Sequence, residues 1–411
     1  MRSVLHLSHF DEYGGSARSG MNIHKGLREL GLDSRMIVGS KSGTDPDVAP
    51  LREGALQAFE PMVHRAGSAA GVQYLADASS FLLARHPWFK EADVLQLYNL
   101  HGGWFAHTAL PLLSRRKPTI WRLSDMWSMT GHCGYAYDCE RWLTGCGSCP
   151  NLGEYPPIRR DATAFNWRVK QWVYAHSALT IVAPSRWLAG MVERSPLIRR
   201  FRLEIIPNGV DTTFFAPGRT DEARRRLSIP PREPVVLVGS LQPRKGGNLV
   251  SDALESAARI AGPFTALVMG PRDGPPAHRA GFRTVDLGVL DDPADVATAY
   301  SASAVMLQPT LADNLPNSIL ESMASGTPVV ALARGGVGEA ITHLEDGFLA
   351  AEPTPESLGV AVARLLRDEE LRSRVATGAR LTVERRFSLQ RQAEAFRALY
   401  EDVLAEGPEG S

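Results

Sequence analysis

The sequence predicts an α/β protein built from two domains, each with a parallel β-sheet covered by helices. Short apolar runs alternate with helical apolar patterns along the whole chain, which is typical of parallel sheets with helical crossovers. The chain has 411 residues, more than one hydrophobic core usually holds. A cluster of turn-forming residues, Pro207, Asn208 and Gly209, interrupts the pattern near the middle. We therefore expect a domain boundary at residues 206–211.

Five apolar runs mark the strands of the first domain. They are residues 3–7, 93–98, 119–123, 179–183 and 203–206. The first run is followed by a helix that Gly31 ends, with one apolar face formed by Ile23, Leu27 and Leu30. The loop before this helix contains Gly14 and Gly15 and lies at the carboxyl end of the first strand. Residues 40–91 have mixed periodicity, and we expect helices there.

Six apolar runs mark the strands of the second domain. They are residues 235–238, 265–269, 285–287, 305–307, 329–332 and 348–350. The last helix, residues 388–406, has one apolar side that it must bury. Its apolar side chains are Leu389, Ala393, Phe396, Tyr400 and Val403. We expect the short tail, residues 407–411, to be disordered.

The composition is that of an ordinary globular protein, with 44% hydrophobic and 22% charged residues. The 45 basic residues balance the 45 acidic ones, so no net positive field attracts nucleic acid. No apolar run is long enough for a membrane-spanning helix, and the first one is too short for a signal peptide. These features predict a cytosolic protein that does not bind nucleic acid. They leave its oligomeric state open.

The most informative segment is residues 310–331, where a polar loop leads into a short helix. Pro316 has a fixed φ and no N–H, which suits the first helical position, with Asn314 or Leu315 as the cap. The amides from Asn317 onward then lack helical partners. Together with the helix dipole, they favour a bound phosphate. The segment therefore predicts a phosphate-binding helix start.

Two carboxylates flank this helix start. Asp313 and Glu321 lie eight residues apart, or about 12 Å along a helix. Acid/base pairs of glycoside hydrolases need a separation of about 5 to 9.5 Å, so these carboxylates do not fit that role. Separate roles at the two ends of one ligand fit better. An ordinary loop-to-helix transition, with an Asp near the positive end of the dipole, is the alternative.

A second candidate phosphate site follows the strand at 235–238. The glycine-rich loop 239–247 carries Arg244 and Lys245, a pair of cations that commonly binds diphosphates. A solvated turn is the alternative for an isolated Arg-Lys pair. Ligands of doubly wound sheets bind at the carboxyl ends of strands, which favours a binding role for this loop. No strand is followed by Gly-x-Gly-x-x-Gly and a downstream acid, which argues against a dinucleotide dehydrogenase.

All four cysteines lie within 17 residues. They are Cys133, Cys139, Cys146 and Cys149. Four clustered thiols in a reducing cytosol favour a structural zinc site over disulfides. Buried free thiols and a redox pair are the alternatives. A closed four-sulfur site leaves no position for a substrate, so we expect it to stiffen the loop that carries it.

The segment 310–331 resembles the acidic signature of the retaining glycosyltransferases of family 4, which have the GT-B fold. Their signature has two acidic residues separated by seven others, then Ala-x-Gly-x-Pro-Val-Val, as in Asp313, Glu321 and residues 324–330. The chain departs from the pattern because Asp313 stands where Glu is usual. This difference bears more on the sugar preference than on the reaction.

The resemblance implies a domain plan. Two Rossmann-like domains that face a cleft would comprise residues 1–208, which bind the acceptor, and residues 209–386, which bind the sugar nucleotide. The final helix, residues 387–406, would cross back to pack on the first domain. The loop with Gly14 and Gly15 would swing against the phosphates of the donor when the domains close.

The resemblance also implies roles in the second domain. Glu321 would hold the ribose hydroxyls of a sugar nucleotide. Asp313 and the amides of residues 314–317 would face the donor sugar and its diphosphate. Arg244 and Lys245 would bind the same diphosphate, with Arg244 replacing an Arg that relatives often have earlier in the loop.

Residues 121–133 resemble a subgroup of these transferases assigned to exopolysaccharide assembly, with a cysteine-rich insertion at residues 132–150. Many family members have a His, which faces the donor sugar, immediately before the position of Asp125. The residue here is Ser124. We expect His132 to take that role and Asp125 to position the acceptor hydroxyl. A structural role of His132 in the cysteine loop, or as a metal ligand, is the alternative.

The loop that begins at His101 follows a strand and is a candidate to line the acceptor cleft. Three tryptophans nearby in the sequence offer flat faces on which sugars stack, but tryptophans are more often buried. They are Trp104, Trp121 and Trp127.

These features predict a retaining glycosyltransferase that moves a hexose-type sugar from a nucleoside diphosphate, first of all UDP, to a hydroxyl of a glycan or lipid-linked glycan. A lipid-linked acceptor would bring the protein to the inner face of the membrane. No Asp-x-Asp pair follows a strand, so we expect no catalytic divalent cation. The alternative is a catalytically silent GT-B protein that binds a sugar nucleotide and supports a partner transferase, which the residues at 313 and 124 favour. A glycan phosphorylase or epimerase is less favoured.

Overall fold

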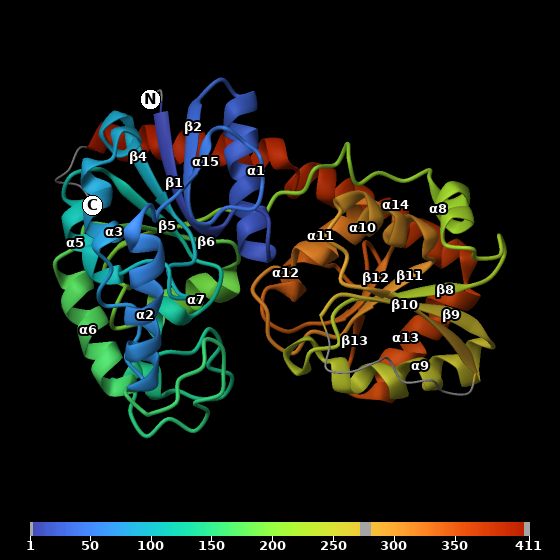
Figure 1. The fold of residues 1–411 in the computed structure, drawn as a ribbon. Coiled ribbons are helices and arrows are strands. Elements are labelled where there is room, and N and C mark those ends of the chain that lie inside the picture. The colour runs from blue at the N-terminus through green and yellow to red at the C-terminus, as the bar shows by residue number, and fades with distance from the viewer. Residues whose placement is uncertain (1–2, 272–280, 407–411) are drawn as a thin grey trace. The chain divides into compact units, whose positions relative to one another are not determined.

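The computed structural model describes residues 3–271 and 281–406, so the tail that we expect to be disordered lies outside the described residues. The chain divides into two compact units, as Figure 1 shows by colour along the chain. One unit is formed by Met1–Pro207 together with Gln390–Ser411, and the other by Asn208–Leu389. The second unit is therefore inserted between two parts of the first.

The described part of the first unit contains a seven-stranded sheet in which all neighbouring strands are parallel. In sheet order the strands are β3 (Val48–Pro50), β2 (Asp33–Ser40), β1 (Ser3–Phe10), β4 (Val94–Leu97), β5 (Thr119–Arg122), β6 (Thr180–Ala183) and β7 (Arg202–Ile205). The strand order reverses between β1 and β4. Ligands of open α/β sheets bind at the carboxyl ends of the strands beside such a switch point.

The second unit has a parallel sheet of six described strands. In sheet order they are β10 (Phe282–Gly288), β9 (Phe264–Met269), β8 (Val235–Val238), β11 (Val305–Gln308), β12 (Val329–Leu332) and β13 (Phe348–Ala350). The order reverses between β8 and β11. The loops that follow these two strands are therefore the ones expected to bind a ligand.

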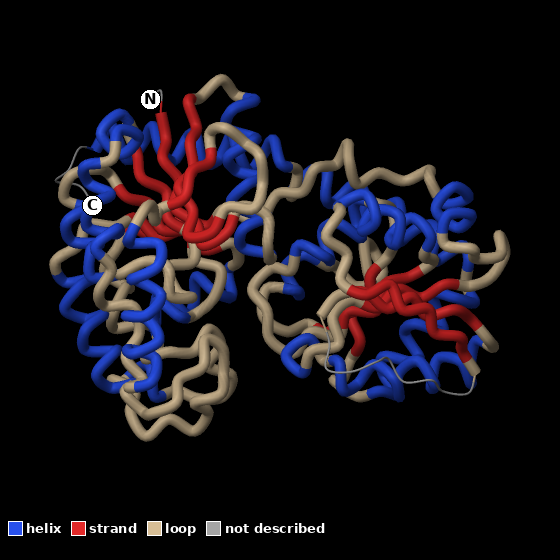
Figure 2. The backbone as a smooth tube through the Cα atoms, viewed as in Figure 1, coloured by secondary structure: helices blue, strands red, loops and turns tan. Residues whose placement is uncertain are grey.

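Helices cover the sheets of both units, as the tube in Figure 2 shows. In the first unit they are α1 (Gly15–Glu29), α2 (Ala55–Ala69), α3 (Ala78–Leu82), α4 (Pro87–Glu91), α5 (Leu110–Ser114), α6 (Thr163–Ala175), α7 (Arg186–Arg194) and α15 (Leu389–Glu406). In the second unit they are α8 (Thr220–Arg226), α9 (Gly247–Ala261), α10 (Pro293–Ala302), α11 (Asn317–Ala324), α12 (Val337–Ala340), α13 (Pro355–Arg367) and α14 (Glu369–Arg386). In the described ranges, none of these helices has the length and apolar character to cross a membrane.

Strand β8 explains why the strands read as continuous apolar runs. Val235 and Leu237 contact the core on one face of the sheet, and Val236 and Val238 contact a second core on the opposite face. Successive side chains of a strand point to opposite faces, and helices cover both faces here. Both sets of side chains must therefore be apolar.

Helix α15 completes one face of the first unit. Its residues Phe396 and Tyr400 pack in one cluster with Val4 of β1 and Val182 of β6. The Tyr400 hydroxyl also donates a hydrogen bond to Gln96 Oε1 at 3.1 Å. The end of the chain thus supplies core side chains to a sheet built by its beginning.

The structure confirms the predicted class, two α/β domains with parallel sheets, and every predicted apolar run contributes to a strand. Two strands, β2 and β3, were not predicted from the sequence. The run of β2 has three consecutive buried apolar residues at 36–38, too few to separate a strand from a helix. Strand β3 has three residues and ends in proline, so it carries almost no periodic signal.

We predict that Phe396→Ala destabilises the first unit by about 3–5 kcal/mol, because it removes a large side chain from a closed core. Phe396 has no exposed surface. Urea unfolding followed by circular dichroism measures the change. Phe59→Ala is the matched control, since Phe59 is 61% exposed and the expected change is within about 0.5 kcal/mol. Equal midpoints for the two variants would show that α15 does not complete the core.

Candidate functional site

The loops after β8 and β11 lie against one another at the switch point of the second sheet. Gly246 follows the 3₁₀ turn Pro243–Lys245 with φ +74°, and a Cβ there would lie 2.0 Å from the Pro309 carbonyl oxygen. Only glycine permits this backbone approach. The Leu311 amide donates to the Arg244 carbonyl at 3.1 Å. These contacts hold the two loops together and fix the side chains that they carry.

Three of the predicted site residues meet between these loops. Lys245 Nζ pairs with the Asp313 carboxylate, and Arg244 Nη1 lies 3.4 Å from Asp313 Oδ2. Burial alone would raise the pKa of Asp313, but Lys245 and then Arg244 lower it below its ordinary value. The carboxylate is therefore ionised at neutral pH. Two cations against one carboxylate leave one net positive charge in this cluster.

Helix α11 begins at Asn317, one residue later than predicted. Pro316 has φ −66° and ψ 125° and stands at the cap, so the predicted caps Asn314 and Leu315 lie in the loop before it. The side chain of Asn208 donates to Leu315 O and to Asn317 Oδ1, both at 2.8 Å. The turn segment at the start of the second unit thus fastens the loop that leads into α11.

Glu321 lies inside α11 and is 8% exposed. Its Oε2 accepts a hydrogen bond from the Tyr300 hydroxyl at 3.0 Å. Tyr300 belongs to α10 and has no exposed surface. Sequence reasoning missed Tyr300, because helical periodicity marks it as buried but does not show which carboxylate it orients.

In the first unit, Gly14 and Gly15 lie between β1 and α1. Gly14 caps the helix with φ +88°, a conformation that favours glycine. The loop is anchored by Asp11, whose carboxylate accepts hydrogen bonds from the Ser42 amide at 3.0 Å and from the Gly43 amide at 2.8 Å. Contacts with Ser42 and Gly43, which follow β2, therefore fix the shape of this loop.

Asp125 follows β5 and is paired with a histidine. His101 Nε2 lies 2.8 Å from Asp125 Oδ2, and the Trp127 amide donates to Asp125 Oδ1 at 2.9 Å. Burial alone would raise the pKa of Asp125, but His101 and these hydrogen bonds lower it. His101 was noted in the sequence only as part of a loop after β4. Its pairing with Asp125 could not be predicted, because it depends on β4 and β5 being neighbours.

His132 lies in the cysteine loop with both ring nitrogens engaged. Nδ1 lies 3.2 Å from the Pro156 carbonyl oxygen, and Nε2 lies 3.4 Å from Cys149 Sγ. The ring is 1% exposed, and burial lowers its pKa. The contacts described for His132 are therefore those of a structural residue, and its role toward a donor sugar stays a prediction.

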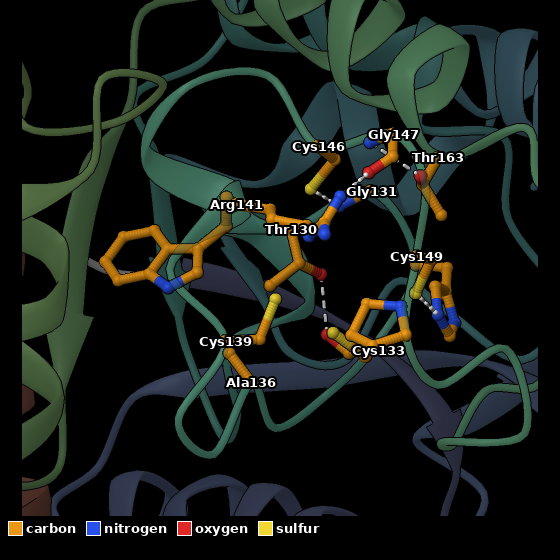
Figure 3. Close-up of a pocket in the computed structure, with 13 residues that line it drawn as sticks. Thr130, Gly131, Cys133, Ala136, Cys139, Arg141, Cys146, Gly147, Cys149 and Thr163 are labelled. Carbon is orange, nitrogen blue, oxygen red and sulfur yellow. Dashed lines mark hydrogen bonds between the residues drawn. The ribbon is translucent and has the colours of Figure 1, made fainter.

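The four cysteines and His132 line one pocket, as the sticks in Figure 3 show for the cysteines. Yet within residues 3–271 and 281–406 no group of three or more His, Cys, Asp or Glu side chains is arranged to hold a metal ion. Cys146 Sγ accepts from the Gly131 amide at 3.2 Å, while Cys149 Sγ contacts His132. These two sulfurs thus face separate partners. Cys133, Cys139, Cys146 and Cys149 form no disulfide, and their binding of zinc stays a prediction.

Lys170 is a buried cation that the sequence gave no reason to single out. It lies in α6 with no exposed surface, and its Nζ donates to the carbonyls of Trp127 and Thr130, the latter at 2.9 Å. The same nitrogen lies 3.6 Å from the centre of the Trp127 ring. Burial lowers the pKa of Lys170 to about 7. Lys170 thus holds the turn between Asp125 and the cysteine loop.

The three tryptophans considered for sugar stacking are core residues. Their exposed fractions are 1% for Trp104, 2% for Trp121 and 1% for Trp127. The burial that is common for tryptophan is therefore found here, and none of the three offers a flat face to a ligand. The exposed aromatic side chains of the same unit include Tyr13, at 64%, and Tyr155, at 56%.

Two family models match the chain. The model described as Glycosyltransferase Family 4 matches residues 13–214, and the model described as Glycosyl transferases group 1 matches residues 232–368. The two matched segments are thus glycosyltransferase domains. The first match includes Asp125, and the second includes the loops that carry Arg244 and Asp313.

Two curated relatives illustrate what these glycosyltransferase domains are similar to. The D-inositol 3-phosphate glycosyltransferase of Acidothermus cellulolyticus is 33% identical over 221 residues, which are 50% of this chain and 49% of that protein. The chain therefore spans about half the length of such curated relatives. A protein of Escherichia coli named as a colanic acid biosynthesis glycosyl transferase, WcaC, is 22% identical over 90% of this chain and 95% of its own length.

A solved structure supports the GT-B fold of these two glycosyltransferase domains. Anabaena Alr3699/HepE, in complex with UDP-glucose, superposes with a TM-score of 0.66 and covers 98% of this chain and 100% of its own. The two sequences are 17% identical, so the likeness concerns the fold alone.

We predict that Cys133 and Cys146 resist alkylation by iodoacetamide at pH 7.5 in the folded protein. Burial raises the pKa of Cys133 to about 12 and that of Cys146 to about 11, and the thiolate is the reactive form. Mass spectrometry of labelled peptides measures the reaction, with urea-unfolded protein as the control. Rapid labelling of both thiols in the folded chain would contradict the prediction. Protection that disappears on adding a zinc chelator would show that bound zinc, and not burial, shields the thiols.

We predict that Lys245→Met lowers the stability of the second unit at pH 7 by about 1–3 kcal/mol, because it leaves the buried Asp313 carboxylate poorly compensated. The pKa of Asp313 is lowered in the folded state, so its contribution to stability is present above the unfolded pKa and is lost as pH falls through the folded pKa. Lys245→Met should therefore also weaken the loss of stability on acidification. Urea midpoints between pH 7 and pH 3 measure both effects.

The double variant Lys245→Met with Asp313→Asn is the control for this prediction. It removes both charges, so most of the stability at pH 7 should return. A double variant as unstable as the sum of the two single variants would show that the two side chains are not coupled.

Proposed function

We propose that this chain is a retaining glycosyltransferase that moves a hexose-type sugar from a nucleoside diphosphate sugar to a hydroxyl group. One observation carries the proposal. The loops after β8 and β11 place Arg244, Lys245 and Asp313 in one cluster at the switch point of the second sheet. The loop after β11 then leads directly into helix α11. A net positive cluster before a helix start suits a diphosphate.

The donor would bind the second unit with its two ends held apart. Arg244, Lys245 and the amides from Asn317 onward would hold the diphosphate. Glu321, oriented by Tyr300, would accept the ribose hydroxyls. We favour a uridine nucleotide, because a solved protein of the same fold was crystallised with UDP-glucose. Asp313 would lie beside the donor sugar, close to the phosphate cations that it pairs with here.

The chemical step would need no protein nucleophile. The bond between the anomeric carbon and the β-phosphate oxygen breaks, and the acceptor oxygen forms the new bond to that carbon on the same face. The acceptor proton passes to the departing phosphate oxygen. Negative charge develops on that phosphate as the bond breaks, and preformed cations and helix amides stabilise it without reorganising. No divalent cation is needed in this scheme.

The acceptor would bind the first unit, where Asp125 would accept a hydrogen bond from a hydroxyl. The likeness to WcaC over most of the chain favours a glycan or lipid-linked glycan in exopolysaccharide assembly. A lipid-linked acceptor would bring a cytosolic protein to the inner face of the membrane. The likeness to D-inositol 3-phosphate glycosyltransferases makes a small polyol phosphate the acceptor class to test beside it.

The decisive experiment incubates the purified full chain with UDP-, GDP- and ADP-sugars, with and without a bacterial glycolipid extract. Release of nucleoside diphosphate and labelling of a product, with the anomeric configuration kept, are expected. Binding of a nucleotide in a thermal-shift assay without release or transfer would identify a silent GT-B protein. Product with the opposite anomeric configuration would contradict the retaining mechanism.

We predict that Lys245→Ala and Glu321→Gln each lower kcat/KM for the donor by about 100-fold or more, since each removes a fixed charge from the donor site. The losses should differ in kind. Lys245→Ala lowers kcat because the charge develops during bond cleavage, whereas Glu321→Gln raises the KM of the donor.

Arg232→Ala and Glu356→Gln are the matched controls for these variants, because both side chains are exposed in the same unit. Turnover close to that of the native chain is expected for both. Native turnover in Lys245→Ala and Glu321→Gln would contradict the assignment of the donor site.

A further inference from the structure

Helix α2 directs charged side chains toward the protein and apolar side chains toward solvent. Glu60 is the one buried residue of this described helix. Its carboxylate accepts hydrogen bonds from Arg52 Nε and from the Ser79 amide, both at 2.8 Å. One turn further along α2, His64 Nε2 lies 2.7 Å from Asp77 Oδ2. Residues four positions apart share one face of a helix, so Glu60 and His64 mark the inner face of α2.

The opposite face of α2 is an exposed apolar stripe. Residues three, four and seven positions apart lie on one side of a helix. Six exposed residues with this spacing are apolar, namely Ala55, Ala58, Phe59, Met62, Ala66 and Ala69. Phe59 and Met62 are each 61% exposed. Arg65 is the only charged residue on this side of the described helix. An exposed apolar surface of this kind marks an interaction site.

The stripe is symmetric about Met62. Ala58 and Ala66 lie four residues before and after Met62, and Ala55 and Ala69 lie seven residues before and after it. Consider two antiparallel copies of α2 related by a two-fold axis at Met62. Residues equally far from Met62 on its two sides then stand at the same height, so alanine meets alanine on both sides of a central Met62 pair. A surface that matches itself in this way is what a two-fold interface requires.

The sizes of the side chains fit the same arrangement. Phe59 would lie next to Ala66 of the second copy, so a large side chain meets a small one. The aliphatic stem of Arg65 would lie next to Ala58 of the second copy, with its guanidinium in water at the edge. Alanines along the seam allow the two helices to approach closely, because the side chains at the contact set the distance between helix axes.

The composition of the stripe favours a protein partner over a membrane. Helices that lie on membranes insert bulky apolar side chains and carry a polar face rich in Lys and Arg. Four of the six apolar residues here are alanines, and Arg65 is the one cation of the stripe. The polar face that a membrane helix would leave in water is bound instead to Arg52 and Asp77.

We propose that α2 is a homodimer interface, which binds α2 of a second copy of this chain antiparallel about a two-fold axis at Met62. Such a dimer would form whether or not the chain transfers a sugar. The helix is about 22 Å long, so the contact is small for a specific interface. We therefore expect a weak, reversible dimer and a monomeric chain in dilute solution.

Sedimentation velocity of the full chain, from micromolar to hundreds of micromolar, measures the association. The mass should rise from 44.8 kDa toward twice that value. Met62→Glu and Met62→Lys should each abolish the rise, since like charges then meet across the axis. An equal mixture of the two variants should restore it, because opposite charges meet in the mixed dimer. A native chain that stays monomeric throughout, or a mixture that associates no better than either variant alone, would overturn the proposal.

A disulfide experiment locates the axis. Under mild oxidation, Met62→Cys should form a covalent dimer faster than Val360→Cys by roughly tenfold or more, because the dimer holds the two introduced thiols together. Val360 is 53% exposed and lies in the second unit, so it is the matched control. The native chain, whose four cysteines are free, gives the background rate. Equal rates for Met62→Cys and Val360→Cys would contradict the two-fold pairing.

Vesicles of phosphatidylglycerol and phosphatidylcholine test the competing occupant. We expect the native chain not to float with them. Flotation that Met62→Glu abolishes, together with a monomeric native chain in solution, would identify a membrane surface and overturn the proposal. Circular dichroism melting checks the fold of each variant, and the native melting temperature is expected because Met62 is exposed. If a charged variant misfolds, the cross-linking of Met62→Cys decides.

Discussion

The contact between the loops after β8 and β11 is the constraint on which the candidate donor site depends. A backbone approach at Gly246 that only glycine permits joins the loops, and the Lys245–Asp313 ion pair closes them. Cations that would repel one another if isolated are held in one place by a shared carboxylate. The sheet contributes by setting β8 beside β11, so that residues 68 positions apart become partners.

The strands of the second unit and the loops of its candidate donor site were predicted well from the sequence, for a physical reason. Each strand of a covered parallel sheet is a continuous apolar run, so the loops after strands could be located from pattern alone. Arg244, Lys245 and Asp313 all lie in such loops. The hydrogen bond from Tyr300 to Glu321 could not be predicted, because it depends on the packing of α10 against α11, which periodicity does not specify.

The first unit shows more clearly what sequence patterns cannot predict. Cysteine spacing predicted a zinc site, but spacing fixes neither the turns between the cysteines nor the direction of each sulfur. The sulfurs of Cys146 and Cys149 face separate partners, and zinc binding stays a prediction. His101 was passed over in favour of His132, since the order of strands that brings His101 to Asp125 is a property of the sheet. Lys170 carries no local signal at all, because its partners are backbone carbonyls supplied by another segment.

The position of α15 has a consequence for how this chain acquires its structure during synthesis. The second unit is made after strand β7 and before α15, yet Phe396 and Tyr400 belong to the core of the first unit. A nascent first unit therefore leaves the ribosome with one apolar sheet face covered only in part, by Ile23 and Leu27 of α1, until the entire second unit has been translated. For that interval the exposed face is a substrate for chaperones, and a ribosome that stalls within the second unit leaves an aggregation-prone fragment.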